Sequence, residues 1–232
     1  MRKLPFDKAK LEEIAAKWPT PFHIYDARAI RENARRLKKA FAWNKGFREY
    51  FAVKATPNPH LMTLLKEFDF GSDCSSMAEL VLAERVGNVG ESIMFTSNDT
   101  PAEEFRKAWE LGAIINLDDI THWDYLCAAV PELAARPLSD AAAQHVFCCR
   151  YNPGPLKGGN AIIGKPEEAK YGFTRDQLFD CYAKMKAAGV TRFGLHTMVA
   201  SNELDPDYII DTAKLLFDLV AELTEKVGIT FE

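Results

Sequence analysis

The chain alternates between short apolar runs with a two-residue period and longer stretches with a helical period. Strands are predicted at 22–25, 50–54, 68–74, 92–98, 114–117, 146–151, 192–199 and 229–231. Helices are predicted at 6–18, 26–41, 61–68, 76–86, 100–112, 121–130, 174–189 and 205–227. From residue 50 on, strand and helix follow each other through seven strands, which is typical of parallel strands joined by crossover helices.

Three helix starts carry the capping-box pattern, in which Ser or Thr is followed three residues later by Glu or Gln. The boxes lie at 76–79, 100–103 and 174–177, and Pro101 sits at the first helical position of the second one. In such a box the two side chains bond reciprocally to the backbone at each other's position. We therefore expect helices to begin at these points.

Polar residues collect where the predicted strands end. They are Lys54, Asp73, Ser97, Asn98, Asp118, Arg150, His196 and Ser201. In a (β/α)8 barrel the carboxyl ends of the strands form one face, on which active sites are built. The alternation itself leaves barrel and open sheet undecided, whereas this clustering favours an α/β fold of the (β/α)8 TIM-barrel type. Because no eighth strand follows, we expect the barrel to be incomplete.

The stretch 50–59 places one lysine at the end of an apolar run. Alternation puts Tyr50, Ala52 and Lys54 on one face, and Pro57 and Pro59 cannot continue a strand. Lys54 is either a surface-seeking side chain at a strand end or an amine held in a dry cleft for Schiff-base chemistry. The stretch alone favours the first interpretation.

Composition narrows the class of protein. The chain has 232 residues, of which 47% are apolar, enough for one sizeable core. Its net charge of −4 gives no electrostatic footprint for nucleic acid or an anionic membrane surface. It contains no apolar run approaching the roughly 20 residues of a membrane span and no signal-peptide core. We expect a cytoplasmic protein with small-molecule or protein partners.

Five cysteines are present, without the paired Cys-x-x-Cys spacing of a zinc site. We expect reduced, mostly buried thiols and no metal site. The glycine- and proline-bearing stretch 152–171 has neither helical nor strand period, and long loops of this kind tend to be lids or binding loops.

Five segments carry a resemblance to a known family, namely 50–55 (YFAVKA), 71–80 (GSDCSSMAEL), 150–153 (RYNP), 170–172 (KYG) and 194–201 (GLHTMVAS). Together and in this order they resemble the fold-type III pyridoxal-phosphate decarboxylases, whose barrel is alanine racemase-like. Within that family the diaminopimelate decarboxylases are the most similar.

The resemblance implies roles for four residues. Lys54 would carry pyridoxal 5'-phosphate as a Schiff base and take part in later proton transfer. Asp73 would lie beside that lysine and the ring, although without the resemblance an acid near a helix start is an equally good interpretation. Arg150 would pair with the acid near the cofactor, and we expect that acid to be Asp73. Ser201 would hydrogen-bond the phosphate, instead of being only a turn residue.

The segment at 194–201 departs from the family pattern. Where the family has His-x-His, this chain has His196 and Met198, so Met198 replaces the histidine that stacks on the pyridine ring. A thioether can lie against an aromatic ring, but it carries no proton to donate. His196 is a candidate ring neighbour or a hydrogen-bonded core histidine. Ala200 stands where the family has glycine and narrows the approach to the phosphate.

The resemblance also implies a domain layout. Residues 1–26 would form a helix and a strand that pack on a β-sandwich domain, and residues 27–232 would form the pyridoxal-phosphate-binding barrel. The family continues into a glycine-rich phosphate loop, an eighth strand and that β-sandwich, so we expect a fragment of a longer protein. Its exposed strand edges predict a homodimer or higher homo-oligomer.

The function implied is decarboxylation of an α-amino acid, with meso-diaminopimelate to L-lysine, in lysine biosynthesis, as the first expectation for substrate and product. Ornithine, lysine and carboxynorspermidine are the alternative substrates. Two other functions stay open, a non-catalytic pyridoxal-phosphate-binding barrel and a folding or assembly unit without cofactor.

Overall fold

A computed structural model describes residues 4–159, 164–169 and 171–232. It contains a sheet of six parallel strands, each hydrogen-bonded to the next in chain order. The strands are β1 (Tyr50–Ala52), β2 (Gly71–Cys74), β3 (Ile93–Thr96), β4 (Ile114–Leu117), β5 (Val146–Tyr151) and β6 (Arg192–Thr197). The predicted parallel alternation is confirmed. Lys170 and part of the predicted loop lie outside the described residues.

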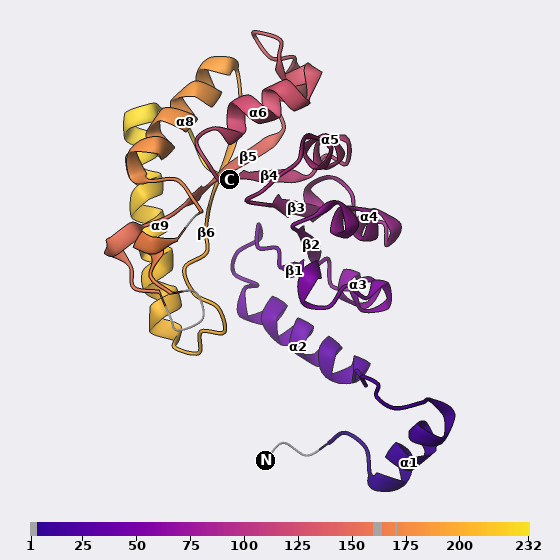
Figure 1. Cartoon of the computed structure of the whole chain (residues 1–232). Helices are drawn as coiled ribbons and strands as arrows, with labels where there is room; N and C mark the ends of the chain where they lie inside the picture. The colour runs from indigo at the N-terminus through magenta and orange to yellow at the C-terminus, as the bar shows by residue number, and fades with distance from the viewer. Residues whose placement is uncertain (1–3, 160–163, 170) are drawn as a thin grey trace.

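The described part of the chain contains the following α-helices, most of which cover the outer side of this sheet (Figure 1). They are α1 (Lys8–Lys17), α2 (Ala27–Ala40), α3 (Pro59–Lys66), α4 (Met77–Arg85), α5 (Ala102–Glu110), α6 (His122–Ala129), α7 (Asp140–Ala143), α8 (Arg175–Ala188) and α9 (Pro206–Val227). Figure 1 shows α3 to α6, α8 and α9 as an outer arc around the strands. Sequential parallel strands inside an arc of helices are the arrangement of a (β/α) barrel. In the described residues the six strands do not close into a ring, because β1 and β6 are the two edges of the sheet.

Most of the core lies between the sheet and the helices. Trp123, Phe147 and Tyr182 are among its largest fully buried side chains, and all four residues of β4 are buried. All five cysteines are buried, as predicted. A smaller apolar cluster on the inner face of the sheet contains Ile114, Val146 and Cys148.

Of the three predicted capping boxes, only the one that begins α8 forms. Thr174 accepts from the Gln177 N–H while the Gln177 side chain accepts from Thr174. At Ser76 and Thr100 the prediction is wrong, because other partners compete. The Ser76 hydroxyl donates to the Glu79 side chain, and the Thr100 hydroxyl donates to the Ser97 carbonyl.

The strands predicted at 68–74, 92–98 and 192–199 are present but shorter, and three other predicted strands are replaced in whole or in part by different structure. β1 ends at Ala52 and turns into a 3-10 helix, η1 (Val53–Ala55), so Lys54 follows the strand instead of ending it. Residues 22–25 are extended but form no strand in the described structure, because they lie away from the sheet. The predicted seventh strand reduces to one bridge between Phe193 and Phe231.

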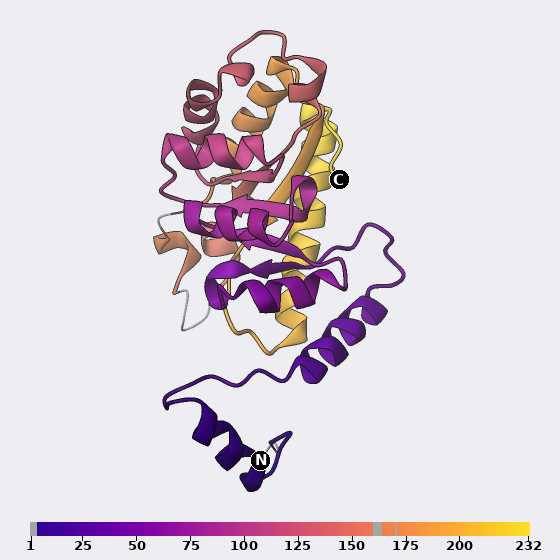
Figure 2. The ribbon, with the colours of Figure 1, turned by 90° about the vertical axis from the view of Figure 1, so that its right-hand side faces the viewer.

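The N-terminal part of the chain projects from this body. Figure 2 shows α1 at the end of an extended segment below the sheet, and α1 buries none of its residues. Its start is nevertheless well formed, since the Asp7 carboxylate accepts from the Lys10 N–H. None of the helices in the described ranges combines the length and apolar character needed to cross a membrane.

Candidate active site

The structure brings five predicted polar residues to the carboxyl edge of the sheet. Lys54 lies in η1 after β1, Asp73 lies in β2, Arg150 in β5 and His196 in β6. Asp118 directly follows β4. Because the strands are parallel and in chain order, their carboxyl ends meet at one edge, and residues far apart in sequence share one surface.

Asp73 is the acid of this edge with the most perturbed ionisation. Burial raises the pKa of its carboxyl to about 6, and the positive charges of Lys54 and Arg150 act in the opposite direction. The negative charge of Glu79, which follows on α4, adds to the rise. The carboxyl therefore titrates within about one pH unit of neutrality, so it can accept or donate a proton in this range.

Lys54 is exposed in the structure, which does not agree with an amine kept in a dry cleft. The backbone explains the difference. The chain leaves the sheet at Val53, which is fully buried and begins η1, and the next residue, Lys54, is exposed. Its charge still reaches Asp73, because it lowers the pKa of that carboxyl.

Arg150 pairs with Asp118 and not with Asp73. The Arg150 Nη1 to Asp118 Oδ1 distance is 2.9 Å, and the two side chains are only 11% and 3% exposed. The guanidinium also lies 3.9 Å from the centre of the Tyr171 ring, and its Nη2 is 3.6 Å from the Met198 sulfur. The predicted pairing with Asp73 is wrong because Asp118, which directly follows the neighbouring strand β4, forms the ion pair with Arg150.

His196 is the Cα partner of Arg150 across the β5–β6 pairing. Burial and the neighbouring Arg150 charge lower the pKa of its imidazole to about 4, so the ring is neutral near pH 7. Its Nδ1 is buried and has no hydrogen-bond partner within the described structure, and the same holds for Arg150 Nε. Buried polar atoms of this kind normally have partners, so their presence indicates a place for a ligand or water.

Two further polar residues of this edge were not predicted. Thr96 ends β3 and Asn116 lies in β4, where the two are Cα partners. Asn116 Nδ2 donates to Thr96 Oγ1 at 2.7 Å, and Thr96 Oγ1 lies 3.4 Å from Asp73 Oδ1. Asn116 in the apolar run 114–117 was the available signal, since a polar residue inside a buried strand needs a partner.

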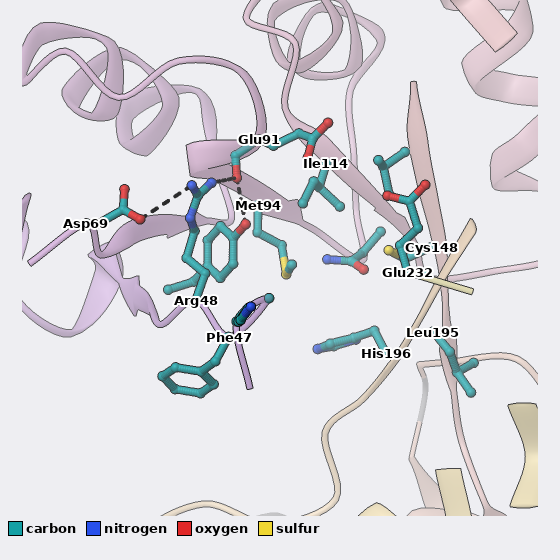
Figure 3. Close-up of a pocket in the computed structure, with 16 residues that line it drawn as sticks. Phe47, Arg48, Asp69, Glu91, Met94, Ile114, Cys148, Leu195, His196 and Glu232 are labelled. Carbon is teal, nitrogen blue, oxygen red and sulfur yellow. Dashed lines mark hydrogen bonds and ion pairs between the residues drawn. The ribbon is translucent and has the colours of Figure 1, made fainter. Parts of the chain in front are cut away.

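The inner face of the sheet forms a cavity of about 550 Å³. Figure 3 shows His196 and Met94 directed into it, with Arg48, Asp69 and Glu91 to one side. At the amino ends of the strands Arg48 donates to the Glu91 carbonyl oxygen and pairs with Asp69.

Gly194 leaves room for the Cys148 side chain on the inner face of the β5–β6 pair. A Cβ at Gly194 would lie 2.3 Å from the Cys148 sulfur, so any other residue here would force that sulfur to move.

The remaining predicted residues lie in the segment after β6. β6 ends at Thr197, so the expected alternation does not extend to Met198, which is 37% exposed and contacts Arg150. Ala200 and Ser201 are half-buried in the turn that precedes α9. The structure thus brings Met198 to the edge and leaves Ser201 in the adjoining loop.

Comparison with known proteins agrees with this arrangement. Residues 27–232 match the family model described as pyridoxal-dependent decarboxylase, pyridoxal binding domain. Protein TabA of Pseudomonas amygdali pv. tabaci is 35% identical over 222 residues, which are 96% of this chain and 49% of TabA. A diaminopimelate decarboxylase of Methanothermobacter thermautotrophicus is 28% identical over 226 residues, covering 95% of this chain and 49% of the relative.

Solved structures show the same fold. The diaminopimelate decarboxylase of M. jannaschii, in complex with L-lysine, superimposes with a TM-score of 0.81 at 23% identity, covering 95% of this chain and 51% of that one. The enzyme from Helicobacter pylori gives 0.80 at 22% identity, covering 96% and 55%. The chain spans about half the length of the curated relatives it matches.

Proposed function

Since the chain belongs to the pyridoxal-dependent decarboxylase family, as its pyridoxal-binding domain, we propose that it binds pyridoxal phosphate at Lys54 and serves the decarboxylation of an α-amino acid. The observation that carries the proposal is the placement of Lys54, Asp73 and Arg150 on one edge of a sequential parallel sheet. Active sites of such barrels lie at this edge.

The residues present fit an aromatic, anionic cofactor. Three buried polar atoms of this region have no partner among the described residues, namely Asn116 Oδ1, Arg150 Nε and His196 Nδ1. Asn116 and His196 both line the cavity on the inner face. Unpaired buried atoms cost free energy, and a bound molecule that supplies hydrogen bonds removes that cost.

Each residue has a distinct part in this proposal. Bound pyridoxal phosphate supplies an aldehyde for an amine and a ring that accepts the electron pair released when carbon dioxide leaves. Lys54 provides the amine, and its exposure leaves it accessible to an incoming aldehyde. Asp73, with a pKa of about 6, exchanges a proton with groups at the ring. Ser201, in the loop after β6, would hold the phosphate.

Arg150 and His196 supply the fixed electrostatics of the site. Asp118 and Tyr171 hold the Arg150 guanidinium from two sides, so that its position does not depend on the ligand. The neutral His196 imidazole offers a hydrogen bond without adding a second positive charge. Met198 provides a polarizable surface against the ring in place of a protonatable one.

The substrate proposed first is meso-diaminopimelate, giving L-lysine. It is supported by the diaminopimelate decarboxylases among the relatives. TabA, at 35% identity, and an L-glutamyl-[BtrI acyl-carrier protein] decarboxylase of Niallia circulans, at 26%, make a different amino acid the alternative.

Borohydride reduction tests the proposal. The chain is incubated with pyridoxal phosphate and reduced, and the modified peptide is mapped by mass spectrometry. We expect the label on Lys54 in the wild type and its loss in Lys54→Ala, with Lys157→Ala as the matched control that keeps it. Labelling of another lysine, or none, would refute the assignment.

The same assay identifies the substrate. An amino acid that displaces Lys54 from the aldehyde protects the lysine from reduction. We expect meso-diaminopimelate to lower the Lys54 label at concentrations at which ornithine, lysine and glutamate do not. Equal protection by all four would contradict the substrate and leave the cofactor assignment intact.

A further inference from the structure

A chain of side-chain hydrogen bonds crosses three neighbouring strands and ends at Asp73. Asn116 on β4 donates through Nδ2 to Thr96 Oγ1 on β3 at 2.7 Å. Thr96 Oγ1 in turn donates to Asp73 Oδ1 on β2 at 3.4 Å. Asn116 is only 1% exposed, so its amide does not exchange partners freely with solvent.

The first bond sets the direction of the second. A hydroxyl group has one proton and two acceptor lone pairs. Because the Asn116 N–H occupies a lone pair of Thr96 Oγ1, the single proton of that hydroxyl is left to point elsewhere. Asp73 Oδ1 is the acceptor that the described structure gives it. The chain therefore delivers a donor to the Asp73 carboxylate.

We propose that Thr96 and Asn116 are positioning residues for Asp73, in which Asn116 orients the Thr96 hydroxyl and Thr96 holds one carboxylate oxygen in a fixed place. The inference rests on the proposed function in one respect only, the use of Asp73 beside Lys54. Neither residue touches the lysine in this arrangement, and both act through the carboxylate. Thr96 has no role in the assignments made above for the cofactor, and Asn116 enters them only through its unpartnered Oδ1, not through the Nδ2 that binds Thr96.

Several neighbouring groups affect the ionisation of Asp73, and the Thr96 hydroxyl is one of them. Burial disfavours its ionised form, and Glu79 on α4 adds a like charge. Lys54 on η1, Thr96 on β3 and Arg150 on β5 favour the ionised form. Among these three, Thr96 is the uncharged group and the one that makes a hydrogen bond to the carboxylate. Its removal therefore raises the pKa of Asp73 while the charges remain.

Carbon-13 NMR of the carboxyl groups measures this directly in the chain without cofactor. Asp73 is assigned by the resonance lost in Asp73→Asn. We expect Thr96→Val, which keeps the shape and removes the donor, to raise the Asp73 midpoint by roughly half a pH unit or more. Thr96→Ser restores it. Thr100→Val is the matched control, because the Thr100 hydroxyl donates to a backbone carbonyl and leaves Asp73 untouched.

Asn116→Leu tests the first link of the chain. We expect it to raise the midpoint in the same direction, because a released Thr96 hydroxyl rotates away from Asp73. If the Asn116 oxygen instead accepts the Thr96 proton, Thr96→Val leaves the Asp73 titration unchanged, and that result overturns the proposal. An unchanged titration in Asn116→Leu alone, with Thr96→Val shifted, excludes Asn116 as a positioning residue.

A second readout uses the cofactor. The pH dependence of borohydride labelling at Lys54 should shift upward in Thr96→Val, in parallel with the Asp73 midpoint, and return in Thr96→Ser. Failure of labelling in the wild type would refute the proposed function, while the NMR titration would still decide the role of Thr96. The two failures are therefore distinguishable.

Discussion

The charged side chains at the two edges of the sheet differ in their exposure and in how completely they are paired. At the amino edge Arg192 pairs with both Glu91 and Glu232 at 2.5 Å, and these side chains are 27%, 47% and 49% exposed. At the carboxyl edge Arg150 pairs with Asp118 in a buried setting, and Arg150 Nε has no partner in the described ranges. The ion pairs at the amino edge are partly exposed, whereas the Arg150–Asp118 pair at the carboxyl edge is buried and leaves a donor unpaired among the described residues.

The difference separates stability from function. An exposed ion-pair network contributes little to the free energy of folding. A buried charge with an unpaired donor destabilises the fold, so we interpret it as a group that pairs with a ligand. The amino edge links the start of β6 to η2 (Gly90–Ser92), which precedes β3. The carboxyl edge holds its charges ready for a ligand.

The largest expected effect comes from breaking the buried pair. Asp118→Ala leaves the Arg150 charge buried without a counter-ion, which should lower the free energy of unfolding by about 3–5 kcal/mol. Urea denaturation followed by circular dichroism measures this change. A loss below about 1 kcal/mol would show that the carboxyl edge is as solvated as the amino edge.

A paired replacement sharpens the same point. In Asp118→Leu with Arg150→Met no charge is left buried, so most of the stability should return. Cofactor labelling at Lys54 should not return, because the guanidinium is gone. Recovery of both properties would mean that the pair serves only folding.

The next effect is on the pH dependence of stability, to which two groups with pKa values shifted in opposite directions contribute. His196 has its pKa lowered from 6.5 to about 4, so its contribution to stability is present above pH 6.5 and is lost as pH falls through 4. Asp73 has its pKa raised from 3.8 to about 6, so its contribution is present below pH 3.8 and is lost as pH rises through 6. The two nearly cancel between pH 4 and 6.

Removing one group at a time exposes the other. Relative to the wild type, Asp73→Asn should lose stability more steeply as pH falls from 6.5 to 4, by up to about 3 kcal/mol. His196→Gln should lose stability less steeply than the wild type as pH falls over the same range, or should gain stability. Melting temperatures across this range provide the measurement, and parallel curves for all three proteins would contradict the buried setting of both groups.

The smallest effect is expected at the amino edge. Arg192→Met removes two exposed ion pairs and should cost about 1 kcal/mol. Because solvent screens these pairs, the cost should fall in 0.5 M salt, whereas the cost of Asp118→Ala should not. A salt-independent loss for Arg192→Met would place both edges in the same dielectric environment.

Much of the fold could be predicted from the chain alone. The predicted bounds of 114–117 and 146–151 match β4 and β5, and Thr174, Gly189 and Gly228 mark helix ends as expected. The barrel, predicted from alternation and polar strand ends, is confirmed by the sequential parallel sheet and the family match. The family and the pyridoxal cofactor, predicted from five short segments, are confirmed by the match of residues 27–232. The homo-oligomer, the cytoplasmic location and the individual roles of the site residues stay predictions.

The sequence by itself determined which residue types end each strand, because local periodicity, turn residues and caps depend only on near neighbours. Only the tertiary structure decided their partners. Arg150 binds Asp118 and not Asp73, and Asn116 reaches Asp73 through Thr96, because these pairings depend on which strands lie side by side. The strand ends at Ala52 and the exposed Lys54 follows in η1 after buried Val53, an ending that alternation along one strand does not predict.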